Sequence, residues 1–140
     1  MAVVGMTWEE TKARCPAGVV AACHNAKDTI TISGDKDAVE KFTEQLKEEG
    51  VFTREVNSAG IAFHSDRMKL TAKSMKERLE KIVKEPRRRS AKWISTSVPE
   101  SKWNTPLGQY CSPDYHVNNA VSPVLFYEAL QHVPENAVLI

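Results

Sequence analysis

The sequence lacks any long hydrophobic run. Its uninterrupted apolar stretches, such as residues 19–23, span only a few positions, whereas a membrane helix needs about 20 apolar residues and a signal-peptide core about 7–15. It also has only three cysteines, with no C-x-x-C spacing, and no Asn-x-Ser/Thr acceptor site. These absences fit a reducing compartment. We therefore expect a cytoplasmic protein that does not enter a membrane.

Several motifs that signal chemistry are missing as well. No G-x-S-x-G turn, no G-x-G-x-x-G loop and no Walker pattern occurs, which argues against nucleotide hydrolysis and leaves no serine nucleophile of the hydrolase type. Cys111 and His116 are separated by four residues, without a second ligand pair at a suitable spacing. We expect no metal site and no cofactor bound by this chain.

The composition is that of a globular protein, and its charge is unevenly distributed. The 140 residues are 41% hydrophobic and 26% charged, with 6 glycines and 7 prolines. Residues 65–92 contain 11 Lys and Arg against 4 Asp and Glu, a net charge of +7, whereas the segments on either side are each −3. This basic segment is either a solvated helix face or a surface for phosphates or an acidic partner.

Hydrophobic patterning predicts the element order β-α-β-β-α-β over about 56 residues. Strands are expected at residues 2–5, 19–23, 29–33 and 51–56, with helices at 7–15 and 36–49. The first helix opens with a capping box from Thr7 to Glu10, and Val39, Phe42 and Leu46 share one face of the second. This order is typical of a ferredoxin-like lobe, in which two helices cover one face of a four-stranded antiparallel sheet.

The remaining chain is expected to contain two helices, a short strand and a long loop. Met68, Ala72, Met75, Leu79 and Ile82 form the apolar seam of one helix from residue 65 to about 84, ended by Pro86. A short buried strand is expected at residues 93–97, loop structure at 98–114 and a helix at 124–131. We place a domain boundary between residues 1–60 and residues 61–140.

Histidines are the natural candidates for acid–base chemistry. His24 is expected in a hairpin loop, and His116 and His132 are expected to be isolated at the surface. His64 directly precedes Ser65, a good helix N-cap, so its ring would stand at the positive end of a helix, which favours the neutral imidazole that a general base needs. From the residues alone, a structural role for His64 remains open.

Six segments spread along the chain resemble one known family. They are residues 18–25, 29–34, 48–52, 61–65, 95–100 and 117–126. Together they are similar to the malonyl/acetyl transferase domain of animal-type fatty acid synthase, and the resemblance covers nearly the whole chain. It implies an α+β fold: a ferredoxin-like lobe followed by the C-terminal portion of an α/β-hydrolase-like acyltransferase lobe.

The resemblance also implies a reaction and site residues. His64 falls on the catalytic histidine of the Ala-Phe-His-Ser motif, Phe63 on the acyl-selectivity position of the malonyl type, and Asn119 in the segment whose main chain orients the histidine. The substrates would be malonyl-CoA or acetyl-CoA. The partners would be the phosphopantetheine arm of an acyl carrier protein and the remainder of the synthase chain.

Two departures from the family pattern matter. The nucleophilic serine, its oxyanion-hole partner and the arginine that binds the malonyl carboxylate belong to sequence before Met1, so this chain alone is expected to be inactive. Asp66 and Arg67 stand where members carry bulky aromatic residues, which puts a charge pair beside the acyl pocket.

The basic segment predicts a role in binding a partner, and an alternative function of the chain is also open. Arg87, Arg88 and Arg89 could steer the acidic carrier protein or the phosphates of coenzyme A. The alternative is a non-catalytic ferredoxin-like binding module from a degenerate paralogue. Nucleic acid is not an expected partner of that module, because its strands lack an aromatic pair of the RNP type and the lobe is net negative.

Overall fold

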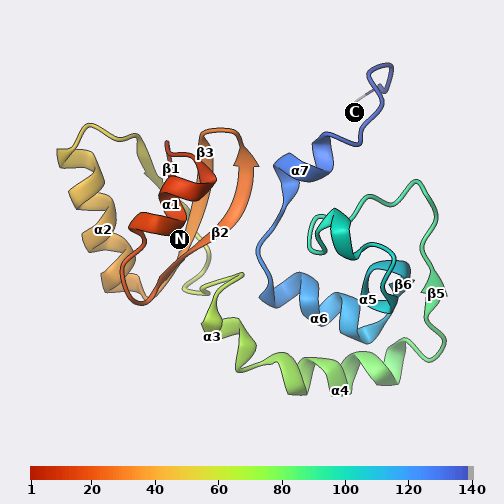
Figure 1. Cartoon of the computed structure of the whole chain (residues 1–140). Coiled ribbons are helices and arrows are strands. Elements are labelled where there is room, and N and C mark those ends of the chain that lie inside the picture. The colour runs from red at the N-terminus through yellow and green to blue at the C-terminus, as the bar shows by residue number, and fades with distance from the viewer. Residues whose placement is uncertain (139–140) are drawn as a thin grey trace.

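The computed structural model describes residues 1–138 and begins with a four-stranded sheet (Figure 1). Its first six elements are β1 (Ala2–Val4), α1 (Trp8–Arg14), β2 (Val19–Ala26), β3 (Thr29–Gly34), α2 (Lys36–Glu48) and β4 (Thr53–Glu55). This is the element order that the sequence predicts. The strands lie in the order β2-β3-β1-β4, and every neighbouring pair is antiparallel. We call residues 1–60 the sheet region.

The sheet region has a continuous hydrophobic core. Ile30 and Ile32 of β3 are fully buried beneath Val39, Phe42 and Leu46 of α2, the three residues that the helical spacing assigns to one face. The side chains of strands alternate between the two faces of a sheet, so Ile30 and Ile32 supply this core while Thr31 and Ser33 are buried on the other face of β3. The sheet region therefore holds its fold by its own apolar packing.

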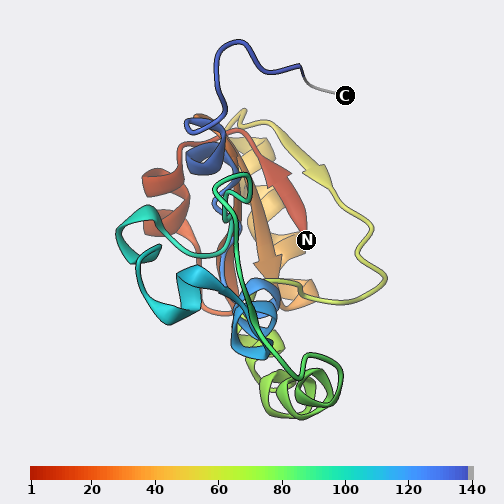
Figure 2. The same ribbon diagram turned by 90° about the vertical axis from the view of Figure 1, so that its right-hand side faces the viewer.

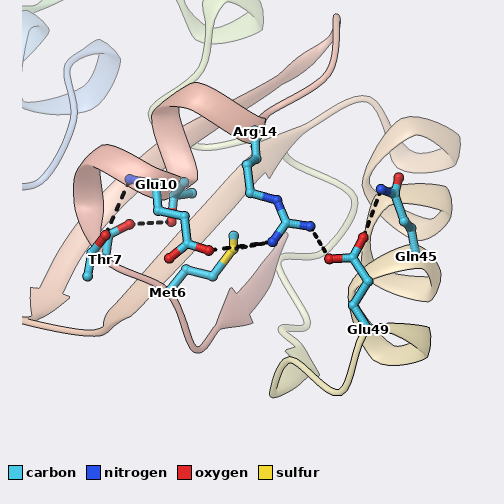
Figure 3. Close-up of polar contacts among 7 residues, drawn as sticks. Met6, Thr7, Glu10, Arg14, Gln45 and Glu49 are labelled. Carbon is cyan, nitrogen blue, oxygen red and sulfur yellow. Dashed lines mark hydrogen bonds and ion pairs between the residues drawn. The ribbon is translucent and has the colours of Figure 1, made fainter.

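Polar contacts join the two helices of this region at one end (Figure 3). Thr7 caps α1, because its hydroxyl oxygen accepts a hydrogen bond from the Glu10 amide at 3.3 Å. Arg14, in the last turn of α1, pairs with Glu49 just after α2, and Gln45 donates to the same carboxylate at 3.0 Å. These bonds from Gln45 and Arg14 lower the pKa of Glu49.

The second part of the described chain, residues 61–138, consists mainly of short helices, and we call it the helical region. Its elements are α3 (Asp66–Lys69), α4 (Ala72–Ile82), β5 (Arg87–Arg88), the 3₁₀ turn η1 (Glu100–Lys102), α5 (Pro106–Gln109), β6 (Tyr110–Cys111), α6 (Pro113–Val121) and α7 (Phe126–Leu130). Strands β5 and β6 pair antiparallel, and α4 packs along α6. Residues 139 and 140 of the predicted second domain lie outside the described residues.

The single helix predicted over residues 65–84 is wrong, since the structure divides it into α3 and α4. The Leu70 and Thr71 amides bond the carbonyls three residues earlier, and the Thr71 hydroxyl donates to the Met68 carbonyl at 2.8 Å. A threonine side chain that bonds the local backbone competes with the helical ladder. The apolar residues do recur at helical spacing, but a turn separates α3 from α4 within that pattern.

The expectations for residues 93–131 also need correction. Residues 93–97 form no strand, because the Ser95 hydroxyl accepts from the amides of Ser97 and Val98 and turns the chain. The predicted loop at 98–114 contains α5, β6 and the start of α6. The last helix is shorter than expected, Phe126–Leu130 instead of 124–131.

The two regions meet along the free edge of β2 (Figure 2). Val124 forms an isolated parallel bridge with Cys23: its amide donates to the Ala22 carbonyl and its carbonyl accepts from the His24 amide, both at 2.8 Å. Helix α7 follows and packs on β2. The segment between α6 and α7 is thus attached to the edge of the sheet.

Candidate functional site

His64 lies at the head of α3, in a backbone conformation that few side chains adopt. Its φ is +57°, the left-handed region that costs a residue other than glycine on the order of 1–3 kcal/mol. The next residue, Ser65, is the N-cap of α3: its hydroxyl accepts from the Arg67 amide and donates to the Ala62 carbonyl at 2.6 Å. Ser65 is buried, so the turn that presents His64 is firmly held.

The ring of His64 is oriented by a carbonyl from a distant part of the chain. Nδ1 lies 2.9 Å from the carbonyl oxygen of Ser122, at the end of α6. A carbonyl can only accept, so Nδ1 carries the hydrogen and Nε2 of the neutral ring keeps a free lone pair. Asn119, the orienting residue that the resemblance implies, lies in the same segment, but the accepting carbonyl belongs to Ser122.

Ser122 is itself held by α6 and by the chain that precedes it. The Ser122 amide donates to the Asn118 carbonyl at 2.8 Å, and its hydroxyl donates to the Asn118 side-chain oxygen, also at 2.8 Å. The side-chain amide of Asn118 then donates to the Ser97 carbonyl at 2.9 Å. These bonds leave the Ser122 carbonyl directed at His64.

A small pocket of about 200 Å³ opens beside His64. It is formed by three segments: β2, the head of α3 and the end of α6, with the lining residues Val20, Ala21, His64, Ser65, Asp66, Lys69, Val121, Ser122 and Pro123. Phe63 lies next to the histidine, with ring centroids 6.5 Å apart, and its side chain is partly exposed. The pocket thus places an oriented imidazole among both apolar and polar side chains, and Phe63 lies beside His64 without lining this pocket.

The two charged residues after Ser65 form separate ion pairs. Asp66 pairs with Lys69 at 2.6 Å on the rim of this pocket. Arg67 makes two bonds, of 2.8 and 2.9 Å, to the carboxylate of Asp35, the residue that precedes α2. This contact lowers the pKa of Asp35 and raises that of Arg67. Arg67 therefore fastens the head of α3 to the sheet region.

The three arginines after Pro86 are not equivalent. Arg87 and Arg88 form β5 and are exposed. Arg89 bonds the Gly108 carbonyl, and its guanidinium lies over the rings of Tyr115 and Trp93, at 4.9 and 5.5 Å from their centroids. The charge of Arg89 is thus engaged inside the helical region, and the steering role expected of it stays a prediction.

The other histidines differ from their expected surroundings. His24 lies in β2, not in a loop, and is 8% exposed. His116 is not isolated, because its Nε2 is 3.2 Å from Cys111 Sγ. The ring of His132 lies tilted against that of Trp103, with centroids 4.6 Å apart, and faces Glu100.

The partly buried thiols of the sheet region, Cys15 and Cys23, have raised pKa values that make them poor nucleophiles. Burial raises the pKa of Cys15 to about 11. It also raises the pKa of Cys23, although a hydrogen bond with Thr31 lowers it in part.

Among residues 1–138, no group of three or more His, Cys, Asp and Glu side chains is arranged to hold a metal ion. Within the same range, none of the helices has the length and apolar character needed to cross a bilayer.

Solved structures define the class of fold. The chain superposes on the acyltransferase domain of the polyketide synthase PpsC of Mycobacterium tuberculosis with a TM-score of 0.83 at 20% identity, over 94% of this chain and 40% of that one. The malonyl CoA-acyl carrier protein transacylase of Coxiella burnetii gives a TM-score of 0.68 at 19% identity, over 94% and 41%. The fold is thus a mixed α/β fold of the acyltransferase type.

Sequence comparison identifies the family. The model of the acyl transferase domain matches residues 1–140, so the chain belongs to the acyl transferase domain family. It is 34% identical over 137 residues to squalestatin tetraketide synthase clz2 of Cochliobolus lunatus and 31% identical over 125 residues to highly reducing polyketide synthase 40 of Fusarium pseudograminearum. These matches cover 95% and 89% of this chain, but about 5% of each synthase.

Proposed function

We propose that this chain is the part of a malonyl/acetyl-CoA:acyl carrier protein transacylase domain that contains the general base, His64. The observation that supports this role is the bond from His64 Nδ1 to the Ser122 carbonyl, because it leaves Nε2 free to take a proton beside a pocket. The ferredoxin-like lobe of residues 1–60 would be an insertion within a larger α/β-hydrolase-like lobe.

The proposed reaction has two half-reactions that use the same base. First, Nε2 of His64 takes the hydroxyl proton of a serine from another part of the domain. The serine oxygen then attacks the thioester carbonyl, the carbon–sulfur bond breaks, and the coenzyme A thiolate takes the proton from His64. In the second half, the pantetheine thiol of a carrier protein gives its proton to His64 and attacks the acyl-serine ester. The ester carbon–oxygen bond breaks, and the serine oxygen regains the proton from His64.

The substrate and partner belong to the same proposal. The Ala62-Phe63-His64-Ser65 motif favours malonyl-CoA or acetyl-CoA, with Phe63 beside the acyl group and Asp66 on the pocket rim. The exposed Arg87 and Arg88 offer positive charge to an acidic carrier protein. We also propose that the remainder of the synthase chain is a partner of this chain and that the enzyme is cytoplasmic.

The parent enzyme is proposed to be a fatty acid synthase, on the six motifs that resemble that family. A polyketide synthase is a second candidate, supported by relatives such as squalestatin tetraketide synthase clz2. Both enzymes would use the same acyl-serine chemistry. The acyl carrier proteins of the two systems distinguish them, since a parent domain should transfer malonyl groups faster to its own class of carrier.

Radiolabelled malonyl-CoA tests the proposal. The 140-residue chain, which has no G-x-S-x-G turn, should acquire no acid-stable ester. A complete acyl transferase domain that contains this chain should be labelled stoichiometrically and should pass the label to a carrier protein. Stoichiometric labelling of the short chain would contradict the assignment of the nucleophile, and an unlabelled complete domain would favour the non-catalytic binding module.

A further inference from the structure

His24 has an environment that the acyl transfer reaction leaves unexplained. It is buried in β2, and its ring contacts two aromatic rings: Trp8 of α1 is stacked at 5.1 Å with an interplanar angle of 10°, and Tyr127 of α7 lies tilted at 4.9 Å. Its Nδ1 is 2.7 Å from the Glu128 carboxylate, also on α7. A buried imidazole with three specific neighbours is a fixed group, not a surface histidine.

His24 attaches the second region to the sheet at two points. Its backbone amide donates to the Val124 carbonyl at 2.8 Å, and its side chain bonds Glu128, four residues further along the same segment. Together with the bond from the Val124 amide to the Ala22 carbonyl, these contacts fix the segment of residues 122–128 along the edge of β2. Charge-assisted bonds of the His24–Glu128 type are stronger than neutral ones.

The same segment contains the carbonyl that orients His64. Ser122 is two residues before Val124, and the intervening Pro123 has a restricted φ. A displacement of Val124 from β2 would therefore rotate or withdraw the Ser122 carbonyl, because little freedom lies between them. The pocket agrees with this link, since Val20 and Ala21 of β2 and Ser122 line it together with His64.

We propose that His24, through Glu128, is a positioning residue for His64: it holds residues 122–128 on the sheet and so maintains the Nδ1–H form of the His64 ring. The proposal rests on the proposed function of His64 as a base, because only a base needs Nε2 unprotonated. His24 touches no reacting atom. Its effect passes through the Val124 bridge and the Ser122 carbonyl.

Nitrogen-15 NMR of the histidine rings in the full 140-residue chain tests this link directly. In the unaltered chain, His64 should show a protonated Nδ1 and an unprotonated Nε2. In Glu128→Ala the two ring shifts should move toward each other as the Nδ1–H form loses its dominance, and exchange of the Val124 amide should accelerate about tenfold. Glu128→Gln, which keeps an acceptor oxygen, should restore the original pattern.

Two further variants complete the design. His24→Phe keeps an aromatic ring beside Trp8 and Tyr127 but removes Nδ1, and it should disturb His64 as Glu128→Ala does. Glu100→Ala is the matched control, because Glu100 also faces an imidazole, that of His132, but not β2; it should leave His64 unchanged. If His24→Phe does not fold, Glu128→Ala alone tests the proposal, because the Glu128 side chain is 46% exposed and its truncation should not unfold the chain.

The outcomes separate this inference from the proposed function. An unchanged His64 pattern in Glu128→Ala overturns the inference, whether or not Val124 exchange accelerates. These spectra involve no acyl substrate, so they do not depend on catalysis. If the His64 pattern responds to Glu128 but a complete domain with His64→Ala still transfers acyl groups at the normal rate, the proposed function fails while the structural link remains.

Discussion

The sheet region and the helical region bury their apolar side chains to very different extents. Ten apolar residues of the sheet region form one buried cluster, whereas α4 of the helical region has no buried residue at all. Large side chains such as Leu70, Ile82 and Phe126 are exposed there. In the described chain, a self-sufficient core thus adjoins a region ordered by caps, local bonds and contacts with β2, and His64 lies where the two meet.

Matched leucine truncations should show the largest difference between the regions. Leu46 is fully buried on α2, so Leu46→Ala should lower the free energy of unfolding by about 2–5 kcal/mol. Leu70 is 80% exposed, and Leu70→Ala should change it by less than about 0.5 kcal/mol. Denaturant unfolding followed by circular dichroism measures both, and equal losses would contradict the contrast in packing.

Local signals predicted the sheet region well. The Thr7 cap and the spacing of Val39, Phe42 and Leu46 involve residues within a few positions of one another, so the sequence displays them directly. The predictions for the helical region were wrong at places where side-chain hydroxyls compete locally with the regular backbone hydrogen bonds. The hydroxyls of Thr71 and Ser95 bond nearby backbone groups and interrupt elements that hydrophobic spacing alone would continue.

The sequence predicted only part of the candidate site. Ser65 signals a helix start and so draws attention to His64. The Ser122 carbonyl is 58 residues away, and Glu128 is 104 residues from His24. A main-chain carbonyl has no residue-type signal, and His24 sits in a run that resembles a hairpin loop. Such long-range pairs depend on how β2 and α7 pack, which spacing cannot predict.

Thiol reactivity should show that the partly buried Cys15 is shielded from water. Burial raises the pKa of Cys15 from 9.0 to about 11, so at pH 8 its thiolate fraction, and its rate of alkylation, should be about a hundredfold below that of an ordinary thiol. The stabilising effect of the neutral thiol is full below pH 9 and is lost as pH rises toward 11. Mass spectrometry of iodoacetamide-treated protein measures the rate, with denatured chain as the reference. Fast alkylation of folded Cys15 would mean that this core is open.

The basic surface of the helical region should have the smallest effect. In a complete acyl transferase domain, changing Arg87 and Arg88 to Ser should raise the KM for carrier protein a few-fold at low salt, with kcat for small thioesters unchanged. Replacing Lys41 and Lys47, two exposed lysines of the sheet region, removes the same charge and is the matched control. If both double variants behave alike, Arg87 and Arg88 form only a solvated face.

The central claim is that the junction of the two regions holds His64 as the base of acyl transfer. The most direct test is the rate of malonyl transfer to carrier protein by a complete domain carrying His64→Ala, compared with His116→Ala, which removes an imidazole that contacts Cys111 instead. We predict a loss of about 10²–10⁴-fold for His64→Ala with unchanged folding, and nearly normal turnover for His116→Ala. Near-normal turnover without the His64 imidazole would contradict the account.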